Sequence, residues 1–223
     1  MDANTPYLIL QYIVNKNQNG YLSPDDYNLI INQAQVSYQS FLIGEFQKYQ
    51  YGRAVDKVEL GMTERVAQTL APFITDPIPL SINVSGKASY PPYHQQVVAM
   101  NYGANFDRIR FVQQDSLYSY LKSRIDPVTT NPVYLLTSTG FTFYPSNLGT
   151  AYLTYISKPP NIVWGYYLDI NGIPTYDVTQ SVAPLWYDID MLEIIARAAQ
   201  MLGINLQANQ VEQYATSIKN QGQ

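Results

Sequence analysis

The sequence predicts an α+β fold, with N- and C-terminal helices that form a small bundle and a β-rich antiparallel meander between them. Two observations predict it. Apolar residues recur at helical spacing near both ends of the chain, and in the middle they alternate with the period of a strand. The 223 residues also contain no long Gly/Ser-rich tether. Most of the chain is therefore expected to be ordered.

We expect one domain over residues 1–223. Its helical part is predicted at residues 1–76 and 183–220, and the β-rich part is predicted as an insertion at residues 77–182.

Two helix starts are recognisable near the N-terminus. Thr5-Pro6 places a hydroxyl cap before a proline at the first helical position. Ser23-Pro24-Asp25-Asp26 is stronger, because Ser23 can cap and the two acids face the positive end of the helix dipole. This second helix is predicted to be long and amphipathic and to end before Gly52.

The middle of the chain reads mainly as strands. A helix from Thr63 to about Pro72 precedes them, and Asp115 is predicted to cap another helix among them. Alternation or β-branched composition predicts strands at residues 78–84, 108–112, 133–136, 141–144 and 151–156. The last three strands are expected to form the meander.

The C-terminal part begins with an irregular, aromatic segment at 164–182 that turns at Asn171-Gly172. A helix follows over 185–202, stopped by Gly203, and a final helix is predicted at 207–219.

The composition favours protein–protein contacts. Only 13% of the residues are charged, 46% are apolar, and 21 are tyrosines. Tyrosine combines a broad apolar ring with a hydroxyl, so it tolerates water before it is buried against a partner. The aromatic segment supplies the interface candidates Trp164, Tyr166, Tyr167 and Tyr176. A compositional habit of the host is the alternative explanation.

The net charge of −4 argues against a dedicated nucleic-acid binder, because neutralising phosphates requires clustered Lys and Arg. Passing contact with DNA is compatible with this net charge. One basic cluster, Arg108, Arg110, Lys122 and Arg124, contacts either DNA or an acidic neighbour, or is a solvated strand face. The chain has no cysteine, which fits folding in a reducing cytosol, and its sequence predicts neither export nor a membrane span.

The sequence predicts no catalytic residue and no cofactor. The single histidine, His94, follows a proline-rich loop and lacks a nucleophile partner. Asp188, Asp190 and Glu193 lie near a predicted helix start, where acids ordinarily serve the helix dipole. General acid–base work or Mg²⁺ binding by these acids is the alternative.

One stretch partly matches the sequence pattern of a calcium-binding loop. Residues 15–26 have glycine at the sixth place, and the possible ligands are Asn15, Asn17, Asn19, Tyr21 and Asp26. Asparagines replace the usual early acids and a short Asp closes the loop, so little negative charge remains to hold a divalent ion. An Asn-rich turn before a capped helix accounts for the same residues, and no metal site is predicted.

The C-terminal half carries a resemblance to a known family. The segments that carry it are Asn131-Pro132-Val133-Tyr134, Phe141–Pro145, Ala151–Pro160, Trp164 and Ser181–Trp186. The predicted helix at 192–206 and Gln213-Tyr214-Ala215 belong to the same series. The stretch from Asn19 to Tyr27 before a long helix is similar as well. Together these resemble the head-to-tail connector, or ring, proteins of short-tailed phages, especially those of the crAss-like type.

This resemblance implies a virion structural protein rather than an enzyme. Such subunits form homo-oligomeric rings, commonly twelvefold, that stack under the portal protein, extend the DNA channel and dock tail proteins. The expected location is the head-to-tail interface of the virion, after synthesis in the host cytoplasm. A tail-associated glycan-binding module, with Trp164, Tyr166, Tyr167 and Tyr176 stacking on sugars, is the alternative, and a hydrolase built on the three acids is a further one.

Overall fold

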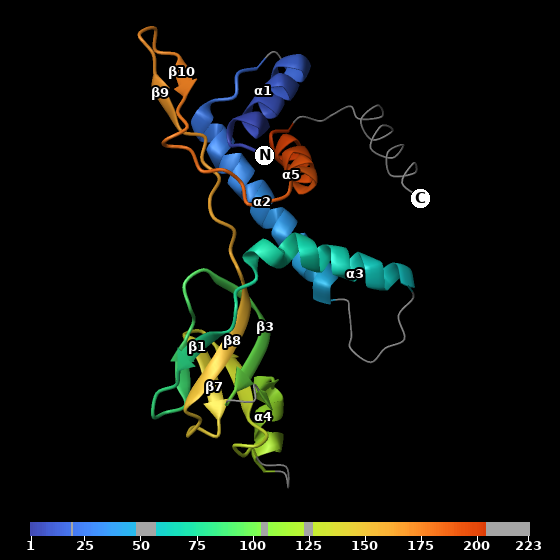
Figure 1. The fold of residues 1–223 in the computed structure, drawn as a ribbon, viewed down its shortest axis with the longest axis vertical. Helices are drawn as coiled ribbons and strands as arrows, with labels where there is room; N and C mark the ends of the chain where they lie inside the picture. Colours follow the sequence, from blue (N-terminus) through green and yellow to red (C-terminus); the bar gives the residue numbers. More distant parts are fainter. Residues whose placement is uncertain (19, 48–56, 104–106, 123–126, 204–223) are drawn as a thin grey trace. The chain divides into compact units, whose positions relative to one another are not determined.

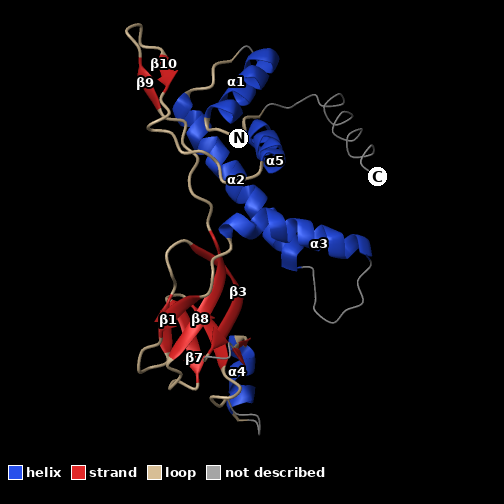
Figure 2. Ribbon diagram, in the orientation of Figure 1, coloured by secondary structure: helices blue, strands red, loops and turns tan. Residues whose placement is uncertain are grey.

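The computed structural model describes residues 1–18, 20–47, 57–103, 107–122 and 127–203. The predicted α+β class is confirmed (Figure 1, Figure 2). The chain divides into two compact units: Met1–Pro72 together with the chain from Pro159 onward, and Phe73–Lys158. We call them the helical unit and the β unit. The segment 159–182, which we grouped with the β-rich insertion, therefore lies with the helices.

The helical unit is built on α1 (Asn4–Gln18), α2 (Pro24–Gln47), α3 (Lys57–Leu70) and α5 (Asp188–Met201). Helix α5 contacts both α1 and α2, and α3 contacts α2. Buried residues recur on α2 at helical spacing, namely Tyr27, Ile31, Ala34 and Tyr38. They form the core of this unit with Leu10 of α1 and with Met191, Ile194 and Ala198 of α5.

The helix ends follow capping chemistry. Ser23 caps α2 as predicted, since its Oγ accepts the Asp26 amide at 3.1 Å and donates to the Asp26 carboxylate at 2.6 Å. The cap predicted for α1 is wrong. The helix already includes Thr5, whose amide donates to the Asp2 carboxylate at 2.9 Å. Hydrogen bonds from the Thr5 side chain and from this amide lower the pKa of Asp2. Gly203 follows the end of α5 with a φ of 65°.

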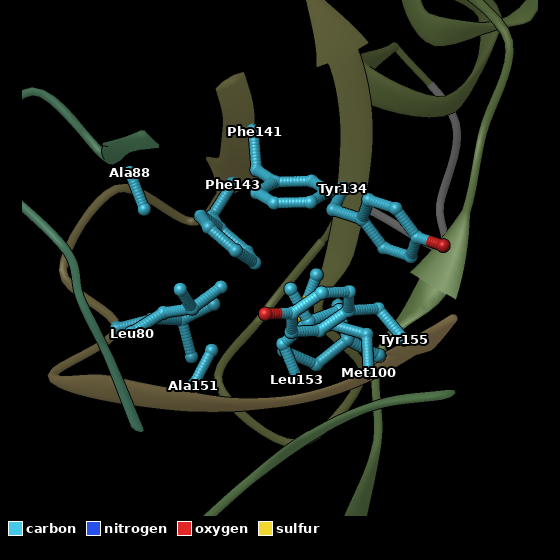
Figure 3. Packing of buried hydrophobic residues seen from close by; sticks show 11 residues of the cluster. Leu80, Ala88, Met100, Tyr134, Phe141, Phe143, Ala151, Leu153 and Tyr155 are labelled. Carbon is cyan, nitrogen blue, oxygen red and sulfur yellow. The ribbon is translucent and has the colours of Figure 1, made fainter. Parts of the chain in front are cut away.

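The β unit contains two four-stranded sheets. The first has the order β1 (Ile78–Ser81), β8 (Thr150–Ser157), β3 (His94–Tyr102) and β4 (Asp107–Arg108). The second has the order β2 (Lys87–Ser89), β7 (Gly140–Tyr144), β6 (Val133–Thr137) and β5 (Arg110–Phe111), with the short helix α4 (Gln114–Leu121) after β5. Side chains from both sheets meet in one core, drawn in Figure 3, that includes Leu80, Met100, Leu153, Phe141 and Phe143.

The predicted meander is wrong beyond its first hairpin. Strands β6 and β7 pair as expected, but β8 pairs with β1 and β3 in the other sheet. Alternating apolar residues indicate which face of a strand is buried, and they do not indicate which strand lies beside it.

The predicted strand 108–112 is divided between the sheets. Arg108 pairs with β3 and Arg110 with β6, while Ile109 between them is buried and donates its amide to the Met100 carbonyl at 2.8 Å. Asp115 does not cap α4, because the N-cap is Gln113 and Asp115 lies in the first turn. The helix predicted at 207–219 lies outside the described residues.

Candidate interaction surface

A ladder of side-chain amides on α2 holds the segment after the β unit. Asn32 donates to the Ile162 carbonyl at 2.8 Å and accepts the Ile162 amide at 2.9 Å. Asn28 does the same for Trp164, at 3.3 and 2.8 Å. Gln35 donates to the Pro160 carbonyl at 3.0 Å and accepts the Trp186 indole N–H at 3.2 Å. These three residues follow the helical repeat, so every second residue of the extended segment meets an amide.

An aromatic cluster continues from the end of this ladder. Trp164 stacks on Tyr7, with centroids 4.2 Å apart, and lies beside Tyr166 and Tyr176 at 5.9 and 5.7 Å. Its indole N–H donates to the Asn4 side chain at 2.9 Å. Burial raises the pKa of Tyr7 to about 12. Trp164 is only 4% exposed, so the prediction that its ring faces a partner is wrong: the helices of its own unit cover it.

Beyond this cluster the chain forms a hairpin of β9 (Tyr166–Leu168) and β10 (Pro174–Tyr176) (Figure 1). We call residues 166–176 the finger. Its base is closed at Gly165, where the amide donates to Ser181 Oγ at 2.9 Å and the carbonyl accepts the Asp177 amide at 2.9 Å. The Asp177 carboxylate in turn accepts the Thr179 amide at 2.8 Å.

The finger tip is also tied down by hydrogen bonds. The Asp169 carboxylate accepts the amides of Asn171 and Ile173, each at 2.8 Å, and this hydrogen bonding lowers the pKa of Asp169. Gly172 completes the turn with a φ of 74°. The predicted turn at Asn171-Gly172 is confirmed, although the strands on either side of it were not predicted.

The finger exposes apolar side chains along its length. Ile170 at the tip is 100% exposed, and Tyr167, Leu168 and Ile173 are each more than half exposed. Tyr166 and Tyr176 are partly covered at the base. Of the four aromatic candidates, Tyr167 therefore presents its ring most fully to solvent. The aliphatic tip was missed, because the sequence reading concentrated on aromatic residues.

The arginine candidates belong to the β unit. Arg108 and Arg110 are both exposed, on edge strands of two different sheets, and Lys122 after α4 is exposed as well. Arg124 lies outside the described residues. Two of these cations thus lie on strands that are consecutive in the sequence, and the aromatic candidates belong to the helical unit.

The three acids near α5 have separate partners. Asp188 forms an ion pair with the Met1 amino group, and Glu193 forms one with Arg197 at 3.4 Å. Asp190 is buried and accepts the Tyr38 hydroxyl at 2.8 Å. Burial and this bond to a carboxylate raise the pKa of Tyr38. Each acid thus has an internal structural contact, and the three do not share one.

His94 is packed among aromatic rings. It stacks on Tyr90 at 4.9 Å and lies 5.7 and 5.4 Å from Phe141 and Tyr155. Its Nε2 is buried and has no hydrogen-bond partner, and burial lowers the pKa of the imidazole. His94 is thus a half-buried side chain packed against the rings at the edge of the core.

The stretch that resembles a calcium loop begins and ends on helices. Residues 15–18 continue α1, which places Asn15 and Asn17 on a helix, and Asn19 lies outside the described residues. Tyr21 is exposed, and the Asp26 carboxylate accepts the Ser23 hydroxyl. Within the described ranges, no three His, Cys, Asp or Glu side chains are grouped as metal ligands.

No protein-family model matches this chain, and no match is found among curated proteins. Among the helices that the structure describes, none has both the length and the apolar character needed to cross a lipid bilayer.

Proposed function

We propose that this chain is a virion structural subunit, a head-to-tail connector of a short-tailed phage that assembles into a ring beneath the portal protein. In this role it extends the DNA channel and docks the next tail component. The chain acts by packing against copies of itself and other proteins, and not as an enzyme.

The observation that carries this proposal is the finger. An isolated two-stranded hairpin is marginally stable in water, yet this one is fixed at its base by Trp164 and at its tip by Asp169. Such fixing lowers the entropy lost on binding. It presents Ile170 and Leu168 to solvent, and apolar side chains held in this way are typical of protein interfaces.

The low charge supports the same role. Over residues 160–176 the sequence contains one charged residue, Asp169, whose carboxylate is engaged by turn amides. Charged residues are depleted at the centres of protein interfaces. The net charge of −4 also suits a channel lining, since a basic lumen would bind DNA and slow its passage.

The test is assembly of the purified chain, alone and with portal and tail proteins of the same phage, followed by mass photometry. We expect closed rings of the chain alone, or saturable binding to the portal of the number of copies that makes up one ring. Ile170→Ser should weaken this assembly about tenfold, because an apolar contact of roughly 1–2 kcal/mol is lost per copy.

Val84→Ser is the matched control. Val84 is a 99% exposed aliphatic residue in the β unit, and its substitution should leave assembly unchanged. A chain that stays monomeric with all these partners would contradict the proposed function, and glycan binding by such a monomer would replace it.

A further inference from the structure

The backbone polar groups of the extended segment 162–169 alternate strictly between two sides. Odd-numbered residues face the returning chain: Val163 exchanges two hydrogen bonds with Val182, Gly165 accepts the Asp177 amide, and Asp169 donates to the Ile173 carbonyl. In an antiparallel pair the residues between such bonds turn their N–H and C=O groups outward. On β9 these residues are Tyr166 and Leu168.

The outward side is occupied only as far as Trp164. There the amides of Asn32 and Asn28 bond Ile162 and Trp164, and the ladder then ends. Among the described residues, no group bonds the outward backbone of Tyr166 or Leu168. The β9 edge of the finger therefore presents two N–H and two C=O groups.

The other edge of the finger is β10. Its outward residues are Pro174 and Tyr176, which stand opposite Leu168 and Tyr166. Proline has no N–H, so this edge presents one N–H and two C=O groups. An open strand edge pairs readily with another strand.

We propose that β9 of one copy pairs antiparallel with β10 of the neighbouring copy, so that the fingers form one continuous sheet around the ring. This inference rests on the proposed function. In the favoured register Tyr166 lies opposite Tyr176 of the neighbouring copy, and Leu168 lies opposite Pro174 of that copy. All three outward N–H groups, those of Tyr166, Leu168 and Tyr176, then find a carbonyl.

Complementarity of the two edges selects a second copy as the partner. Head-to-tail contacts form a ring when the rotation between copies closes, and in a closed ring of fingers neither edge of any copy stays open. A two-fold pairing of β9 with β9 would leave every β10 edge unpaired. The register also brings no like charges together, because Asp169 is the only charged residue in the finger.

Disulfide cross-linking tests the pairing directly, since the natural chain has no cysteine. In the proposed contact, residue 167 of one copy lies opposite residue 175 of the next at a position without hydrogen bonds, where Cα atoms are about 4.5 Å apart. Tyr167→Cys and Thr175→Cys chains are purified separately, mixed, assembled with the portal and oxidised. A covalent dimer of one Tyr167→Cys chain and one Thr175→Cys chain is expected.

The single variants serve as controls. A covalent dimer of Tyr167→Cys alone would show β9 paired with β9 and would overturn the proposal. Rings that assemble without the mixed cross-link would also overturn it and would leave the proposed function standing. Failure of the unmodified chain to form rings or to bind the portal would overturn the proposed function itself.

A second pair of variants isolates the edge. Leu168→Pro removes an outward N–H and keeps the finger's own hydrogen bonds at residues 167 and 169. It should weaken ring assembly about tenfold or more, whereas Leu168→Thr, which keeps the N–H, should assemble much better than the proline variant. Equal assembly by the two variants would contradict edge pairing.

Discussion

Gly165 lies where two backbone segments approach too closely for any side chain. A Cβ at this position would lie 2.5 Å from the carbonyl carbon of Gln180. We expect Gly165→Ala to destabilise the chain by about 1–3 kcal/mol, because the base of the finger must open to admit the methyl group. Urea unfolding followed by circular dichroism measures the change.

Gly44→Ala is the matched control. Gly44 lies inside α2 with nothing within 4 Å of the added Cβ, so the same substitution should stabilise the chain by about 0.5–1 kcal/mol. If Gly165→Ala also stabilised the chain, the backbones of Gly165 and Gln180 could not lie as close together as described.

We expect His94 to make the stability of the β unit sensitive to pH. Burial lowers the pKa of its imidazole below the ordinary value, so at slightly acidic pH the unfolded chain binds a proton more readily than the folded chain does. Stability is therefore full above about pH 6.5 and falls as the pH drops from there toward the lower folded-state pKa.

The measurement compares unfolding midpoints of the natural chain and of His94→Phe at pH 7.5 and 5.5. Phenylalanine fits among the rings of Tyr90, Phe141 and Tyr155 and cannot be protonated. The variant should lose less stability on acidification than the natural chain does. Because the chain has one histidine, the difference reports His94 alone, and an identical loss in both proteins would refute the assignment.

At the scale of elements, the amide ladder of α2 fixes the segment that leads into the finger. Asn32→Ala removes both hydrogen bonds to Ile162, and the Ile162 backbone then loses its partners in a partly buried place. We expect a loss of about 1–3 kcal/mol. Amide hydrogen exchange should rise over residues 160–168.

Gln33→Ala on the same helix is the control for this effect. Gln33 is exposed and lies next to Asn32 in the sequence, so its removal should leave exchange in the segment unchanged. Equal exchange in the two variants would mean that the ladder does not hold the segment.

Local sequence signals predicted where most helices lie and predicted the strand pairing poorly. The helix predicted to start at Thr63 begins earlier, at Lys57. The Ser23 cap and the apolar repeat of α2 act within a few residues, so the sequence shows them directly. Strand β3 was missed because its residues His94–Tyr102 are mixed in polarity and mostly half-buried. The partners of β8 depend on contacts far along the chain, which periodicity does not report.

The segment that forms the finger was singled out from the sequence, but its structure was not predicted in detail. The aromatic segment does carry the finger, yet Trp164 is buried within it, because composition cannot distinguish an aromatic ring that packs inward from one that faces a partner. The Asn171-Gly172 turn with Tyr166–Leu168 before it and Pro174–Tyr176 after it was the available hairpin signal. The short strands and the proline obscured it.

At the scale of the whole molecule, the β unit has the marks of an inserted domain. Its two ends lie side by side: Ile74 bridges Ile156, the Thr75 amide donates to the Tyr155 carbonyl at 3.0 Å, and Ser157 Oγ donates to the Phe73 carbonyl at 3.1 Å. Its core is formed by its own residues, with Phe141, Phe143 and Leu153 almost fully buried. Ends that lie close together and a hydrophobic core of its own are typical of a segment that can fold alone.

We therefore expect residues 73–158, expressed by themselves, to fold cooperatively. The fragment should show dispersed amide resonances and a single thermal transition, and His94→Phe should reduce its pH sensitivity as it does in the full chain. As a control, Phe141→Ala should cost the fragment about 3–5 kcal/mol, since it empties the centre of the core. A fragment with the spectrum of an unfolded chain would mean that the β unit depends on the helices for its stability, and that the two units are one cooperative fold.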